Sequence, residues 1–142
     1  MKTPAYNEKV KDAISSLVKR YELDMLILFG SQATGKTHTE SDFDIAYYSS
    51  KKIDFDQESR LNADLTGIFK NDKVSLVNLK MASPLLFKEI MSKGVVLYSQ
   101  NSSMFSQLYT LALRMYEEAK PLFELRRHYV SNKLNEYRHA RS

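Results

Sequence analysis

The fold is decided by residues 25–48, which read MLILFGSQATGKTHTESDFDIAYY. Residues 25–29 form a short, continuous apolar run that stops at Gly30, a pattern typical of a buried strand. Residues 42–47 alternate between charged or small residues (Asp42, Asp44, Ala46) and large apolar ones, which predicts a second strand. The polar stretch 30–41 contains two glycines and predicts a loop between these strands.

Elements on both sides of this segment complete the predicted fold. Before it, Thr3-Pro4 predicts an N-cap with proline at the first helical position, and apolar residues then recur at helical spacing as far as Tyr21. After it, the pattern predicts, in order, a helix over about 55–70, a strand over 74–79, a helix from Ser83-Pro84 to Gly94 and a strand over 95–98. The sequence therefore predicts a mixed α/β (α+β) domain.

The C-terminal segment predicts helices with a basic excess. From about Ser103 the apolar residues again recur at helical spacing, and they include Phe105, Leu108, Leu111, Ala112 and Met115. Pro121 should break or kink this segment, with a second helix beyond it, because proline lacks the backbone N–H that a helix interior needs. Residues 102–142 contain seven Lys/Arg and four Asp/Glu, so most of the chain's net charge of +4 lies there. This charge suits a docking surface for an acidic partner or nucleic acid, and it equally suits a solvated helix face.

Length and composition narrow the class of protein. A chain of 142 residues fits one domain. No apolar run approaches the roughly 20 residues that a membrane-spanning helix needs, and the N-terminus lacks the apolar core of a signal peptide. The absence of cysteine excludes disulfides and thiolate metal sites. We therefore expect a cytoplasmic protein.

Asp42 and Asp44 are the residues that point to chemistry. Because residues i and i+2 of a strand face the same side, the two carboxylates should project side by side. Two carboxylates so near each other repel unless a cation neutralises them. Hard oxygen ligands of this kind suit Mg²⁺ bound together with substrate phosphates. Gly30 and Ser31 end the preceding strand, where a glycine backbone allows close approach of a triphosphate and a serine hydroxyl can donate to a phosphate oxygen. Each pair alone is ordinary on a protein surface, but their joint occurrence predicts a metal- and nucleotide-binding site.

A different motif overlaps this one. Residues 30–37 satisfy G-x-x-x-x-G-K-T, the phosphate-binding P-loop pattern, and they follow an apolar strand. That pattern needs a helix starting at Lys36, but the residues after Thr37 carry no helical apolar stripe and lead into a strand. We therefore interpret the P-loop match as a coincidence.

The arrangement resembles that of the nucleotidyltransferase superfamily related to DNA polymerase beta, and in particular its minimal nucleotidyltransferase group. The motif of that family, G-S-x10-D-x-D, is present as Gly30-Ser31 followed, after ten residues, by Asp42-Phe43-Asp44. The stretch VSLVNLKMASPLLFKEIMSKGVVLY also resembles the third strand, helix and final strand of the family. The resemblance implies a polymerase beta-like core with a small mixed sheet flanked by helices. It also implies ATP as substrate and Mg²⁺ held by Asp42 and Asp44.

One departure from the family pattern concerns a third carboxylate. Many members carry it on the strand after the central helix, where this chain has Ser75. Asp72 lies nearby, but three positions of shift would place it at the strand end and on the opposite face. The departure puts catalysis by two metal ions in doubt and leaves catalysis by positioning and one metal possible.

Small members of this group resemble the antitoxin partners of HEPN-domain RNase toxins. The resemblance implies a magnesium-dependent protein adenylyltransferase that moves AMP from ATP to a tyrosine hydroxyl of a cognate HEPN toxin and thereby neutralises it. Two alternatives stay open: a binding antitoxin without catalysis, and a small-molecule nucleotidyltransferase of the aminoglycoside type. Residues 1–100 are predicted to form the catalytic core, and residues 101–142 a helical extension that belongs to the same domain or docks a partner. Neither membrane association nor direct nucleic-acid binding is expected.

Overall fold

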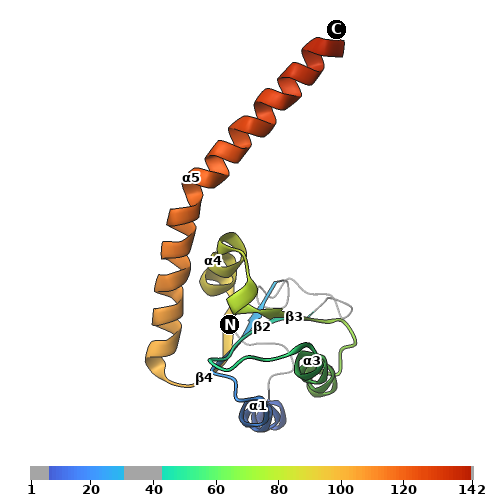
Figure 1. The fold of residues 1–142 in the computed structure, drawn as a ribbon. Coiled ribbons are helices and arrows are strands. Elements are labelled where there is room, and N and C mark those ends of the chain that lie inside the picture. The colour runs from blue at the N-terminus through green and yellow to red at the C-terminus, as the bar shows by residue number, and fades with distance from the viewer. Residues whose placement is uncertain (1–6, 31–42, 142) are drawn as a thin grey trace.

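A computed structural model describes residues 7–30 and 43–141 of the chain (Figure 1). Its elements follow in the order α1 (Glu8–Tyr21), β1 (Met25–Phe29), β2 (Phe43–Tyr48), α3 (Phe55–Phe69), β3 (Val74–Asn78), the 3-10 turn η1 (Leu79–Met81), α4 (Pro84–Lys93), β4 (Val95–Ser99) and α5 (Ser102–Arg141). The type and order of the elements predicted from residue 10 onward are confirmed, except for the second C-terminal helix.

The four strands form one sheet in the order β3-β2-β1-β4. β1 is antiparallel to both of its neighbours, whereas β2 and β3 run parallel. The predicted small mixed sheet is therefore confirmed. The parallel pair is connected through α3, as a crossover between parallel strands requires.

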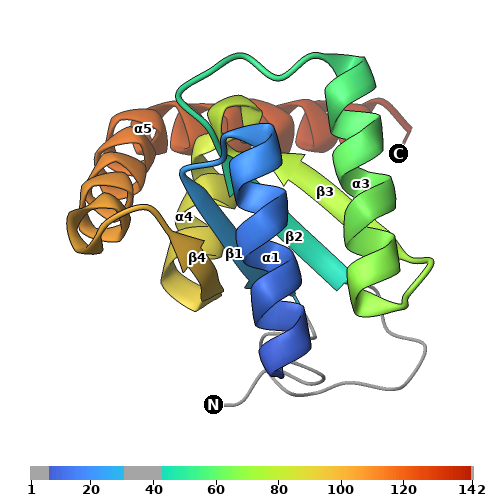
Figure 2. The same ribbon diagram turned by 90° about the horizontal axis from the view of Figure 1, so that it is seen from below.

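Helices cover both faces of the sheet. Figures 1 and 2 show α1 and α3 on one face, and α4 with the beginning of α5 on the other. Along β2, Phe43, Ile45 and Tyr47 are buried in the cluster shared with α1 and α3, whereas Ala46 is buried with residues of α4 and α5. Because strand residues alternate between faces, Asp44 lies on the same face as Ala46, the one that α4 and α5 cover.

The helix starts follow from capping side chains, and one predicted start is wrong. α1 begins at Glu8, where the Asn7 side chain accepts a hydrogen bond from the backbone N–H of Val10 at 3.0 Å. The predicted cap at Thr3-Pro4 lies outside the described residues, and a Pro4 start would put Asn7 inside the helix, whereas its backbone is extended. The predicted start of α4 is confirmed, with Ser83 as N-cap and proline in the first turn.

Gly94 ends α4 as predicted, but for a different reason. Its φ is −76°, so it does not use the left-handed conformation that normally selects glycine after a helix. A Cβ on Gly94 would instead overlap the side chain of Ile27 and the backbone oxygen of Ile90. The glycine therefore allows α4 to pack tightly against β1.

The C-terminal segment is one helix of 40 residues with Pro121 inside it. The predicted second helix is thus wrong, and the predicted kink remains: Figure 1 shows α5 changing direction partway along its length. Proline in a helix interior removes one hydrogen bond and crowds the preceding turn, which is the usual cause of such a bend. Leu108 and Ala112 are buried as expected, but Leu111 is 39% exposed. Neither α5 nor any other helix in the described ranges is long and apolar enough to cross a bilayer.

Candidate active site

Gly30 and Asp44 meet where β1 ends and β2 begins. Phe29 pairs with Asp44 in the antiparallel register, and Gly30 follows it with a φ of +76°, a left-handed conformation that favours glycine. A Cβ built on Gly30 would overlap the Oδ2 atom of Asp44, so the carboxylate lies against the glycine backbone. A ligand bound to this stretch of backbone would therefore lie beside the carboxylate.

The surroundings of Asp44 fit a divalent cation. It is half-buried in a strand whose residues Phe43 and Ile45 are buried, so the fold holds the carboxylate in place while leaving it accessible. A triphosphate placed against Gly30 would bring several negative charges next to this carboxylate. Such an arrangement is repulsive without a cation between the groups, and oxygen ligands of this kind suit Mg²⁺.

Two of the predicted site residues, Ser31 and Asp42, lie outside the described residues. Within residues 7–30 and 43–141, no three side chains of the metal-binding types gather to form a complete metal site. Because Asp42 directly precedes the described part of β2, the prediction that it pairs with Asp44 on one face stays a prediction.

Ser75 lies where the resemblance to nucleotidyltransferases leads us to expect a third carboxylate. In the parallel register of β2 and β3, Ser75 is the partner of Asp44. Ser75 is exposed and lies on the same face of the sheet as Val77, which packs with the cluster of α4 and α5. A hydroxyl group therefore stands beside Asp44 where an acid would complete the site. Asp72 precedes β3 and does not replace it.

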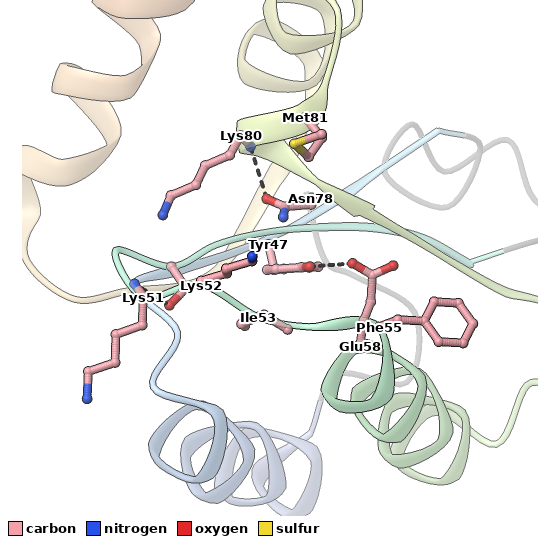
Figure 3. Close-up of a pocket in the computed structure, with 10 residues that line it drawn as sticks. Tyr47, Lys51, Lys52, Ile53, Phe55, Glu58, Asn78, Lys80 and Met81 are labelled. Carbon is pink, nitrogen blue, oxygen red and sulfur yellow. Dashed lines mark hydrogen bonds between the residues drawn. The ribbon is translucent and has the colours of Figure 1, made fainter.

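A cavity of about 510 Å³ lies at the other end of β2 (Figure 3). Its lining includes Tyr47, Lys52, Phe55, Glu58 and Met81, and Figure 3 shows Tyr47 and Glu58 directed toward each other. Tyr47 lies three positions after Asp44 and therefore faces the opposite side of the sheet. The cavity is thus separate from the contact between Gly30 and Asp44.

The Tyr47 hydroxyl donates a hydrogen bond to the Glu58 carboxylate. Burial raises the pKa of Tyr47 well above its ordinary value, and the adjacent carboxylate raises it further. Two lysines of this region already have partners, since Lys51 pairs with Glu22 at 2.6 Å and Lys80 lies 5.5 Å from the centre of the Tyr48 ring. This cavity could not be predicted from the sequence, because strand alternation indicates only that Tyr47 is a core residue.

The strand pairing contradicts the P-loop interpretation without reference to residues 31–42, which lie outside the described ranges. A P-loop follows a strand of a largely parallel sheet. The strand that precedes residues 30–37 is β1, and it is antiparallel to both neighbours. A mixed four-stranded sheet that sets a glycine at the end of one strand against an aspartate of the next is instead the arrangement that the resemblance to nucleotidyltransferases implies.

Comparison with known families gives the same class. The chain belongs to the Polymerase beta, Nucleotidyltransferase family, whose model matches residues 11–103. The match contains β1, β2 and the residues between them, and it ends shortly after α5 begins.

Two curated relatives of this chain are both protein adenylyltransferases named MntA. The chain is 30% identical over 145 residues to the protein adenylyltransferase MntA of Aphanizomenon flos-aquae, an alignment covering 96% of this chain and 97% of the relative. It is 31% identical over 87 residues to the protein adenylyltransferase MntA of Shewanella oneidensis, covering 60% of this chain and 62% of the relative.

Solved structures share the fold. One is a toxin-antitoxin structure with AMP-PNP, which superposes with a TM-score of 0.72 at 24% identity and covers 87% of this chain and 98% of that one. Another is a tri-AMPylated HEPN toxin of Shewanella oneidensis in complex with its MNT antitoxin, with a TM-score of 0.66 at 21% identity, covering 88% and 96% of the two chains. The predicted fold is therefore confirmed.

Proposed function

We propose that this chain is an antitoxin that transfers AMP from ATP to a tyrosine hydroxyl of a cognate HEPN-domain RNase toxin and thereby neutralises it. The observation that carries the proposal is the contact between Gly30 and Asp44, found in a chain that aligns over 96% of its length with a protein adenylyltransferase. The contact supports the proposal, because nucleotide transfer needs a carboxylate that can hold a metal next to backbone that can hold phosphates.

The proposed reaction is an in-line substitution at the α-phosphorus of ATP. The tyrosine oxygen forms a new bond to that phosphorus, the bond to the β-phosphate oxygen breaks, and pyrophosphate leaves. The phenolic proton goes to solvent. In this chain, the Gly30 backbone and the Ser31 hydroxyl would hold the phosphates, while Asp42 and Asp44 would hold Mg²⁺. When bound, the metal would supply positive charge that offsets the negative charge of the phosphates.

Intact-mass spectrometry of the toxin tests this function. The chain is incubated with ATP, Mg²⁺ and its purified cognate HEPN toxin, and the toxin should gain the mass of one or more AMP units. Omission of Mg²⁺ should abolish the gain. Asp72→Asn is a matched control for Asp44→Asn, because Asp72 is an exposed acid that lies before β3. It should leave the mass gain intact. An unchanged toxin mass with a folded, ATP-binding chain would contradict the proposal.

A second candidate is an antitoxin that neutralises by binding alone. Ser75 favours it, because this hydroxyl stands beside Asp44 where a third acid would complete the site. The two candidates differ in one measurement: inhibition of the toxin's RNase activity by the Asp44→Asn variant. Binding alone predicts full inhibition by the variant without ATP, whereas the proposed enzyme requires both Asp44 and ATP.

A further inference from the structure

The outer half of α5, residues 120–141, has almost no packing within the described chain. Of residues 120–140, only Phe123 is half-buried, and it lies near Tyr116, with ring centres 6.2 Å apart. All the others are exposed. Figure 1 shows this part of α5 projecting away from the sheet. Most helical stability in proteins comes from packing of an amphipathic face. Contact with a partner would therefore stabilise this exposed part of the helix.

The outer half has an apolar face made of two adjacent stripes. Leu122, Leu125 and Tyr129 form the first at spacings of three and four residues, and Val130, Leu134 and Tyr137 form the second in the same way. The exposed fractions of these six residues range from 48% to 67%. Large apolar side chains grouped on one helix face in this way indicate a protein-binding surface.

Positive charge accompanies this apolar face. By helical spacing, Arg126 and Lys133 lie between the two stripes. Lys133 also lies 5.7 Å from the centre of the Tyr129 ring. Residues 120–141 contain six Lys/Arg and two Asp/Glu, a net charge of +4 that equals the net charge of the whole chain. The remaining residues are therefore neutral in sum.

This charge decides between possible occupants. A second copy of the chain would bring two helices of net charge +4 together, which opposes association. Nucleic acid would satisfy the charge but leave the leucines uncovered. A protein surface with acidic groups between apolar ones satisfies both properties.

We infer that the outer half of α5 is the docking surface for a patch of the toxin in which acidic groups lie between apolar ones, an inference that rests on the proposed function. The inner half of α5 packs on the sheet face that carries Asp44, and the outer half continues from it on the same side of the sheet (Figure 1). A toxin held there is therefore tethered on the side of the sheet where AMP would be transferred. Tethering raises the effective concentration of the acceptor hydroxyl at the site.

Isothermal titration of the chain into purified, RNase-inactive HEPN toxin tests the inference. The double variant Leu125→Gln, Tyr129→Gln keeps the charge and should weaken the Kd at least ~30-fold, as loss of central apolar anchors does. The variant Arg126→Gln, Lys133→Gln should bind less tightly and with a smaller dependence on salt. The control Ser131→Gln, Asn135→Gln changes two exposed residues on the opposite side of the helix and should bind like wild type.

Two results would overturn the inference. One is wild-type affinity of the Leu125→Gln, Tyr129→Gln variant, with ATP binding confirming that it is folded. The other is sedimentation of the toxin-free chain as a dimer that this variant dissociates, which would assign the face to a second copy. The proposed function fails separately: a wild-type chain that binds the toxin through α5 but transfers no AMP contradicts the function and leaves the docking surface intact.

Discussion

The two halves of α5 belong to one continuous helix, but they have different surroundings. The inner half buries Leu108 and Ala112 against α4 and the sheet, and Lys88 of α4 lies 4.1 Å from the centre of the Tyr116 ring. The outer half exposes leucines and tyrosines of similar apolar character. The two halves therefore do not differ in residue type. They differ in whether α4 and the sheet pack against them. We expect the core to carry the chemistry and the outer half to carry partner recognition.

The largest expected effect comes from the core. Asp44→Asn should lower AMP transfer by about 10²–10³-fold, the usual cost of removing one group that stabilises transition-state charge. Its affinity for the toxin should stay within ~3-fold of wild type, because α5 is untouched. Single-turnover transfer and titration calorimetry measure the two quantities. Equal losses in both would erase the distinction between the two regions.

A pair of truncations compares the halves directly. Leu108→Ala should lower the free energy of unfolding by about 2–5 kcal/mol, because it leaves a cavity between α5 and its neighbours. Leu125 is 67% exposed, so Leu125→Ala should change that free energy by less than about 0.5 kcal/mol. Urea denaturation measures both. A destabilisation by Leu125→Ala as large as that by Leu108→Ala would show that the outer half packs within the chain.

Much of the folded core could be predicted from the sequence. The short apolar run at 25–29, the alternation at 42–47 and the capping pair Ser83-Pro84 each depend on local pattern, and each corresponds to an element of the structure. The strands could be predicted because each depends on residues that are neighbours along the chain. The motif at Gly30 and Asp44 could be identified for the same reason.

The remaining features depend on contacts between distant residues. Periodicity marks a helix face as apolar, but it cannot show that α4 ends before reaching residues 120–141. Leu111 and Leu108 belong to the same predicted stripe, yet only Leu108 meets the sheet side closely enough to be buried. The reason for Gly94 lies in the side chain of Ile27, which is 67 positions earlier. The pairing of Ser75 with Asp44 needed a strand register that no local pattern specifies.

A glycine comparison tests the site without touching α5. Gly30→Ala should reduce transfer strongly, because the new Cβ overlaps the Asp44 carboxylate and the left-handed φ strains alanine by about 1–3 kcal/mol. Gly67→Ala is the matched control: nothing lies within 4 Å of its Cβ position in α3, and alanine favours the helix by about 1 kcal/mol. If both variants retained full transfer, Gly30 would not be part of the site.

The smallest expected effect concerns the Tyr47–Glu58 pair. The pKa of Tyr47 is raised in the folded state, so its stabilising contribution is complete below the unfolded value of about 10. Above that pH the unfolded tyrosine ionises first, and the contribution is lost as pH rises. Tyr47→Phe should cost about 1 kcal/mol at neutral pH, and its difference from wild type should shrink above pH ~10. A difference that stayed constant from pH 8 to 11, measured by urea denaturation, would contradict this account.

The central claim is that AMP transfer depends on Asp44 and that toxin capture depends on the outer half of α5. The most direct test is the intact mass of the HEPN toxin after incubation with ATP, Mg²⁺ and each of three proteins at low concentration: wild type, Asp44→Asn, and Leu125→Gln with Tyr129→Gln. We predict AMP addition by wild type, addition at least ~100-fold slower by Asp44→Asn at any concentration, and slow addition by the α5 variant that recovers when its concentration is raised. Full AMP addition by Asp44→Asn, or no AMP addition by wild type, would contradict the account.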